Sequence, residues 1–254
     1  MAVLEVTDDA FLGGRLQLMQ PKKGHRAGLD AVLLAASVEA PSEARVLDVG
    51  AGCGIVGLAL AVRRGDVRVT GLEIEPELVE LAQENARRNG LGDRVQFVQG
   101  DVAAPAAELE ARGLVPASFD VVVSNPPYLD PQTSRASPFP LQARASSMAE
   151  AGLDRWGRLF AAMARNDGRL WMIHRADALR TILDALDGRF GALAVRPLHP
   201  RADAPATRVV VSGVKGSRAP LSLRAGLILH DAEGRFRPEV DRALRSPLPL
   251  EETI

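Results

Sequence analysis

The residues with the clearest chemical potential are Asn125, Pro126, Pro127 and Tyr128, which end the apolar stretch FDVVVSNPPYLD. Proline cannot continue a central strand, and it forces the residue before it into an extended conformation. The amide oxygen of Asn125 and the carbonyl of Pro126 can together accept both N–H bonds of a planar amino group, while Tyr128 stacks on the flat group that carries it. We therefore interpret these four residues as catalytic, because such a clamp turns the nitrogen lone pair towards an electrophile.

A second constellation lies in LDVGAGCGIVGLAL, between an apolar strand and a helix. It combines an acid with evenly spaced glycines: Asp48, Gly50, Gly52 and Gly54. Glycine lets the backbone approach a ligand closely, and an acid at this position suits the positive amino group of S-adenosylmethionine. The same letters contain G-x-G-x-x-G at Gly52, Gly54 and Gly57, which is typical of a dinucleotide site but starts late in this loop. The loop alone leaves both ligands open.

Two further acids end the next two predicted strands: Glu73 in GLEI and Asp101 in QGD. The carboxylate of Glu73 can accept ribose hydroxyls, and that of Asp101 can accept from the amino group of an adenine ring. An ordinary turn glutamate and a helix N-cap are the alternative roles. Because parallel strands end at the same edge of a sheet, we expect both acids beside the glycine loop.

The elements that must position these residues alternate between strands and helices. Strands are predicted at 44–49, 67–74, 94–101, 119–125 and 168–174, and helices at 55–64, 75–90, 106–113, 148–166 and 175–188. This alternation predicts a Rossmann-like α/β fold, with a mostly parallel sheet and helices on both faces. Strands at 191–200 and 207–215 have no helix between them, so we expect an antiparallel hairpin at one edge.

The composition excludes several classes of protein. Hydrophobic residues make up 46% and charged residues 25% of the 254, which is typical of a globular domain. The single cysteine, Cys53, excludes an internal disulfide and fits a reducing compartment. The histidines follow no metal spacing, so no metal is expected. With no apolar run of membrane-spanning length and no signal peptide, the protein is expected to be cytoplasmic.

In order and spacing, VLDVGAGCG, GLEI, QGD and NPPY resemble the class I methyltransferases that use S-adenosylmethionine, specifically those that methylate amino groups. The resemblance implies a seven-stranded sheet with an antiparallel last strand. It also implies that the segment RAGLDAVLLA packs over the cofactor, which makes Gly28 and Asp30 cofactor candidates alongside Asn125, with helix capping as the alternative role for Asp30. We therefore expect an N-terminal extension at 1–43, a short hairpin and helix over the cofactor site, and a methyltransferase domain at 44–254 that includes the C-terminal hairpin and tail.

The flanking segments narrow the resemblance. TDDAFLGGRLQLMQPKKGHRAGLDAVLLAA and HPRADAPATRVVVSGVKGS are similar to the bacterial tRNA adenine-N6 methyltransferases that modify a valine tRNA beside the anticodon. That family implies transfer to N6 of an adenine in tRNA. A protein glutamine N5-methyltransferase, which also uses Asn-Pro-Pro-Tyr, and a DNA adenine methyltransferase remain alternatives. An NAD-dependent oxidoreductase leaves Asn125 to Tyr128 unexplained.

An RNA substrate needs positive charge for its phosphates, although the formal net charge is -1. The first basic cluster precedes the segment over the cofactor: Lys22, Lys23, His25 and Arg26. The second follows the predicted hairpin: Lys215, Arg218 and Arg224. We expect both clusters beside the open crevice, where they would contact phosphates, with an ordinary solvated surface as the alternative.

Overall fold

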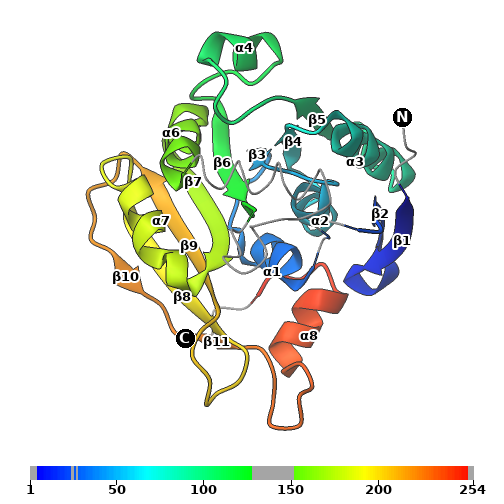
Figure 1. Ribbon diagram of the computed structural model, residues 1–254, viewed down its shortest axis with the longest axis vertical. Coiled ribbons are helices and arrows are strands. Elements are labelled where there is room, and N and C mark those ends of the chain that lie inside the picture. Colours follow the sequence, from blue (N-terminus) through cyan, green and yellow to red (C-terminus); the bar gives the residue numbers. More distant parts are fainter. Residues whose placement is uncertain (1–4, 24–25, 27, 128–151, 251–254) are drawn as a thin grey trace.

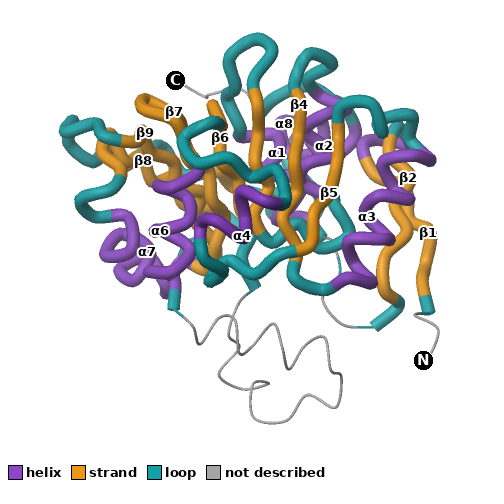
Figure 2. The backbone as a smooth tube through the Cα atoms, turned by 90° about the horizontal axis from the view of Figure 1, so that it is seen from above, coloured by secondary structure: helices purple, strands orange, loops and turns teal. Residues whose placement is uncertain are grey.

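The computed structural model describes residues 5–23, 26, 28–127 and 152–250. Within them a central twisted sheet is covered by helices on both faces (Figures 1 and 2). Its parallel strands are β3 (Arg45–Val49), β4 (Arg68–Glu73), β5 (Val95–Gln99), β6 (Phe119–Ser124) and β7 (Ala164–Arg175). The remaining long strands are β8 (Phe190–His199) and β9 (Arg208–Lys215).

The order across the sheet is β5-β4-β3-β6-β7-β9-β8, with β9 antiparallel to both of its neighbours. The predicted Rossmann-like fold and its antiparallel hairpin are therefore confirmed. The described part of the sheet has nine strands, because the two-residue strands β10 (Ser222–Leu223) and β11 (Leu227–Ile228) pair with β8. The sequence predicted that this hairpin forms the edge of the sheet. In the structure the short strands β10 and β11 lie outside β8, and β9 lies between β8 and β7.

The helices form one layer on each face of the sheet. The first layer contains α1 (Leu29–Ser37), α2 (Ile55–Arg63), α3 (Pro76–Arg88) and α8 (Pro238–Arg245), and the second contains α4 (Ala106–Ala111), α6 (Leu153–Met163) and α7 (Leu179–Leu186). Helix α2 is buried almost all round, since it packs on the sheet and is covered by α1. Helix α3 begins at Pro76 and is followed by Gly90, whose φ of 66° only glycine adopts readily.

The helix expected at 148–166 differs from the structure at both ends. It begins at Leu153 after Gly152, and residues 148–151 lie outside the described residues. It ends at Met163, because Ala164 already pairs with Phe119 and starts β7. Sheet pairing across the chain therefore takes residues that local sequence assigns to the helix.

The N-terminal hairpin consists of β1 (Val6–Phe11) and β2 (Leu16–Pro21), joined by the 3-10 turn η1 (Leu12–Gly14). Two asparagines attach it: Asn85 in α3 and Asn89, which caps the end of that helix, exchange hydrogen bonds of 2.7–2.9 Å with the backbone of Met19 and Gln17. These amides satisfy the outer edge of β2, much as a neighbouring strand would. The hairpin and α1 also share one apolar core with α2 and the sheet. The division of the chain into an N-terminal extension and a methyltransferase domain at residue 43 stays a prediction.

Candidate active site

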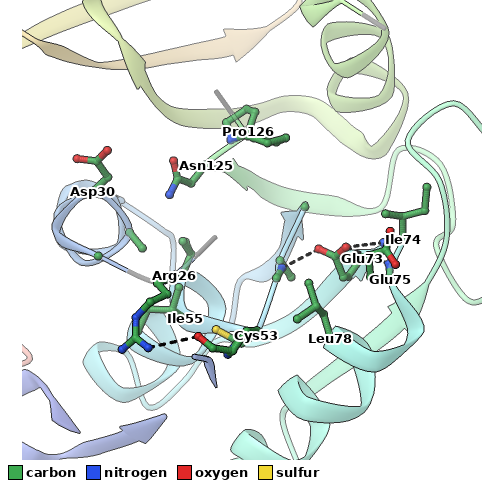
Figure 3. A pocket seen from close by; sticks show the side chains of 18 of the residues that line it. Arg26, Asp30, Cys53, Ile55, Glu73, Ile74, Glu75, Leu78, Asn125 and Pro126 are labelled. Carbon is green, nitrogen blue, oxygen red and sulfur yellow. Dashed lines mark hydrogen bonds between the residues drawn. The ribbon is translucent and has the colours of Figure 1, made fainter. Parts of the chain in front are cut away.

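The carboxyl ends of β3, β4 and β6 open into one pocket of about 340 Å³ (Figure 3). The chain reverses its order across the sheet here, with β4 on one side of β3 and β6 on the other, and such a switch point is where open α/β sheets bind ligands. Helix α1 and the segment before it form the opposite wall. The lining is mostly apolar with a few charged side chains, as in small-molecule sites.

The loop after β3 brings its glycines to this pocket in different ways. The N–H groups of Gly50 and Ala51 donate to the carbonyl of Leu72 in β4, at 2.8 and 3.0 Å. Gly50 and Gly52 line the pocket with φ of 72° and 57°. A Cβ atom at Gly52 would meet no atom within 4 Å, so the backbone there faces open space in which a ligand fits.

Gly54 has a structural role that the sequence did not distinguish from the others. It does not line the pocket, and it has a φ of 91° at the start of α2. A Cβ atom there would lie 2.6 Å from Phe97, whose ring also fills the space beside Gly71. The third glycine of the pattern thus permits tight packing of the helix on the sheet.

Glu73 lines the pocket at the end of β4 and holds the glycine loop in place. Its Oε2 accepts from the N–H of Gly52 at 2.8 Å, and its Oε1 accepts from Ile74 and Glu75 at 2.9 and 3.1 Å. Burial raises the pKa of this carboxyl. Since a carboxylate offers about four acceptor sites, one remains for a ribose hydroxyl.

Asp48 lies beneath the glycine loop and not on the pocket surface. Its Oδ2 accepts from the N–H of Gly57 at 2.9 Å, while its buried Oδ1 has no hydrogen-bond partner among the described residues. Burial raises the pKa of Asp48 to about 7, and the charge of Glu73 adds to the effect. Asp48 is therefore not placed for the expected direct contact with the amino group of the cofactor. Its carboxylate can act on the cofactor only through its electric field or through a bridging water.

The turn after β6 places Asn125, Pro126 and Pro127 in the pocket lining. The hydroxyl of Ser124 donates to the carbonyl of Val49 at 2.8 Å, which fixes the end of β6 to the end of β3. Pro126 is buried, and Asn125 and Pro127 are half-buried. Figure 3 shows Asn125 and Pro126 across the pocket from Glu73 and Glu75. Tyr128 lies outside the described residues.

Helix α1 contributes Gly28 and Asp30 to the pocket. The N-cap of this helix is Gly28, so the capping alternative for Asp30 is wrong. Asp30 lies in the first turn, and its Oδ2 accepts from the Nε of Arg208 at 2.8 Å. This ion pair joins α1 to the start of β9 at the pocket.

Asp101 does not line the pocket. Its Oδ1 accepts from the N–H of Ala103 at 2.8 Å in the turn before α4. The helix itself is capped by Pro105, so Asp101 is not its N-cap. The structure therefore shows a turn-forming carboxylate where the sequence suggested an adenine contact.

Sequence reasoning missed three residues of the site. Trp156 is buried in the core and also lines the pocket, and its ring lies 2.8 Å from where a Cβ of Gly50 would be. Asn85 donates to the carbonyl of Cys53 at 3.0 Å and so connects α3 to the glycine loop. Arg26, assigned to phosphate binding, lines the pocket. A buried asparagine on the apolar face of a predicted helix was the one available signal.

Cys53 is a small packed residue. It is 5% exposed, and burial raises the pKa of its thiol to about 12, so the thiol is unreactive at neutral pH.

The two basic clusters lie near opposite ends of the parallel strands. Lys22 pairs with Glu5 at 3.5 Å near the pocket end of the hairpin. Lys215 instead donates to the carbonyl of Ala164 at the start of β7, where the parallel strands begin. The expectation that Lys215 and Arg218 lie beside the crevice is therefore wrong, because the antiparallel direction of β9 carries its end away from the pocket.

Residues 27–175 match the methyltransferase small domain family. The chain belongs to this family. The methyltransferase also resembles a crystal structure described as a predicted O-methyltransferase from Agrobacterium tumefaciens, with 30% identity and a TM-score of 0.74 over 89% of this chain and 100% of that one. The class I fold and the family assign S-adenosylmethionine as the methyl donor, and they exclude the oxidoreductase alternative.

Two curated relatives carry more specific names. The methyltransferase is 29% identical to a tRNA1(Val) (adenine(37)-N6)-methyltransferase from Dickeya chrysanthemi over 83% of each chain. It is 35% identical to a release factor glutamine methyltransferase from Chlorobaculum tepidum, over 38% of this chain and 32% of that protein. These two names correspond to adenine and glutamine, the two kinds of amino group that the Asn-Pro-Pro-Tyr sequence alone could not distinguish. No helix among the described residues is long and apolar enough to cross a membrane.

The pocket fits the cofactor. The uncovered backbone of Gly52 accommodates a ligand, Glu73 offers an acceptor for a ribose hydroxyl, and the apolar walls suit an adenine ring. The buried Oδ1 of Asp48, without a hydrogen-bond partner among the described residues, favours a positive group above the loop. When bound, the cofactor supplies an activated methyl group.

Proposed function

We propose that the methyltransferase transfers a methyl group to N6 of an adenine in tRNA, beside the anticodon. The observation that carries this proposal is the turn after β6, where Asn125, Pro126 and Pro127 line the same pocket as Glu73 and the glycine loop. A planar amino group is a poor nucleophile because its lone pair is delocalised. Two oxygen acceptors that hold both of its hydrogens favour a pyramidal nitrogen with an available lone pair.

In this proposal the side-chain oxygen of Asn125 and the carbonyl of Pro126 hold the amino group, and Tyr128 stacks on the base. As the nitrogen forms its bond to the methyl carbon, the bond from that carbon to sulfur breaks and the nitrogen releases one proton to solvent. An adenine within an anticodon loop reaches the pocket only after it leaves its stack. Gly28, Gly50, Gly52 and Glu73 hold the cofactor, and Trp156 supports Gly50 from behind.

The choice of tRNA over protein draws on the relatives. The relative named for tRNA aligns over 83% of this chain, whereas the one named for release factors aligns over 38%. The segment before β3, with Pro21, Arg26 and α1, flanks the pocket. Glutamine methylation stays the second candidate, because its planar amide fits the same pair of acceptors.

The experiment is a transfer assay with labelled S-adenosylmethionine and separate pools of tRNA, ribosomal RNA, DNA and release factor. Label is expected in tRNA, and nuclease digestion followed by mass spectrometry should place it on N6 of an adenine beside the anticodon of a valine tRNA. Label that enters only release factor would replace this proposal by glutamine methylation. An Asn125→Ala protein in parallel identifies transfer that depends on the pocket.

A further inference from the structure

The charges that line the pocket are unevenly distributed. Among the described lining residues, Arg26 is the one cation, and the other charged side chains are the carboxylates of Asp30, Glu73 and Glu75. Figure 3 shows Arg26 beside Cys53 and Ile55, on the side of the pocket away from Glu73 and Glu75. A ligand that spans the pocket from Glu73 therefore meets positive charge at its far end.

The N-terminal hairpin holds the guanidinium of Arg26 in place. Its Nη1 donates to the hydroxyl of Thr7 at 2.9 Å and to the carbonyl of Pro21 at 3.3 Å, and its Nη2 donates to Asp9 at 2.9 Å. The same oxygen of Asp9 accepts from Thr7 and from Gln20, both at 2.7 Å. This network orients the side chain before any ligand arrives, and the hairpin is itself anchored to α3 by Asn85 and Asn89.

The contacts to the hairpin leave part of the guanidinium available. An arginine has five N–H donors, and those of Nε and one of Nη2 have no partner among the described residues. Paired N–H groups of this kind match the two oxygens of a carboxylate. Asp9 already balances one positive charge, so the remaining donors suit a single small anion better than a string of phosphates.

We propose that Arg26 binds the carboxylate at the methionine end of S-adenosylmethionine. The cofactor carries one anionic group, the carboxylate, which lies on the other side of the sulfonium from the ribose that Glu73 would hold. This role replaces the phosphate contact that the sequence predicted for Arg26 together with Lys22 and Lys23. The inference depends on the cofactor alone, so it stands or falls independently of the proposed acceptor.

The test is a calorimetric cycle without RNA. The ligands are S-adenosylmethionine and its decarboxylated analogue, which keeps the sulfonium and the amine. The native protein should bind the intact cofactor roughly tenfold to a hundredfold more tightly, the usual worth of a charge-assisted hydrogen bond. In Arg26→Met this preference should disappear, because only the affinity for the intact cofactor falls.

Arg88→Met is the matched control. Arg88 pairs with Asp8 on the same hairpin, one residue from the partner of Arg26, and it does not line the pocket. This variant should keep the full preference for the carboxylated ligand while it loses a comparable ion pair. If Arg26→Met weakens both ligands equally, the proposal is wrong and Arg26 only supports the hairpin.

Arg26→Lys covers the case in which Arg26→Met does not fold. Lysine keeps the charge but loses the planar pair of donors, so the preference should shrink without vanishing. An unchanged preference in this variant would overturn the proposal. So would unchanged cofactor binding by Arg26→Met combined with weaker tRNA retention on filters, since that result returns Arg26 to the phosphates.

Discussion

The two ends of the pocket are built by different means. At the cofactor end, backbone N–H groups of the loop after β3 bond to the end of β4, through Leu72 and the carboxylate of Glu73. At the acceptor end, two consecutive prolines stiffen the turn after β6, and the hydroxyl of Ser124 ties the end of that strand to β3. Hydrogen bonds therefore hold the cofactor end in place, whereas the proline rings restrict the backbone at the acceptor end. Substitutions should therefore separate binding of the cofactor from transfer to the acceptor.

Asn125→Ala should show the largest effect. If the amide acts only on the acceptor nitrogen, transfer should fall by about a hundredfold or more while the affinity for S-adenosylmethionine stays within about twofold. Single-turnover transfer and calorimetry measure the two quantities. Ser124→Ala is the neighbouring control, and it should lower stability by roughly 1 kcal/mol without removing transfer. Loss of cofactor binding in Asn125→Ala would show that the two ends are not separable.

Gly52→Ala and Gly54→Ala should divide binding from folding within one loop. A methyl group at Gly52 points into the open pocket, so the affinity for the cofactor should fall while unfolding shifts by only about 1–2 kcal/mol from the left-handed backbone. A methyl group at Gly54 meets Phe97 at 2.6 Å, so stability should fall by roughly 2 kcal/mol or more. Denaturant unfolding and calorimetry compare the pair. Equal effects of both substitutions on stability would contradict this division.

Asp48→Asn should change how the stability of the protein depends on pH. Folded Asp48 keeps its proton up to a pKa of about 7, whereas in the unfolded chain it ionises near pH 4. The folded state therefore binds more protons between these values, so this group makes the protein less stable as pH rises from about 4 to 7. The asparagine variant removes that loss, and its stability relative to the native protein should increase across the same range.

His174 makes this difference measurement necessary. Burial lowers the pKa of its imidazole to about 4, so its contribution to stability is lost as pH falls, the opposite direction to Asp48. Denaturant unfolding of the native protein and of Asp48→Asn at several pH values isolates the contribution of Asp48, because His174 contributes equally to the stability of both proteins. A constant difference between the two curves would show that Asp48 is ionised throughout.

Much of this molecule follows from its sequence. The alternation of strands and helices, the glycine loop and the turn at Asn125 predict the fold and the place of the pocket, because periodicity and turn chemistry act over a few residues. The carboxyl ends of parallel strands lie on the same side of a sheet, so the sequence alone could place Glu73 and Asn125 in one crevice. The domain boundary and the residue roles remain predictions.

Other features depend on distances that only the folded chain establishes. Asp48 lies under the loop and Gly54 packs on Phe97, although both belong to the same pattern as Gly50 and Gly52. Trp156 reaches Gly50 from more than a hundred residues away in sequence. The basic clusters separate because β9 runs against its neighbours, so that Lys215 lies where the parallel strands begin, whereas Arg26 lines the pocket where they end. Local sequence encodes which side chains can do chemistry, whereas sheet order, strand direction and close packing decide which of them meet.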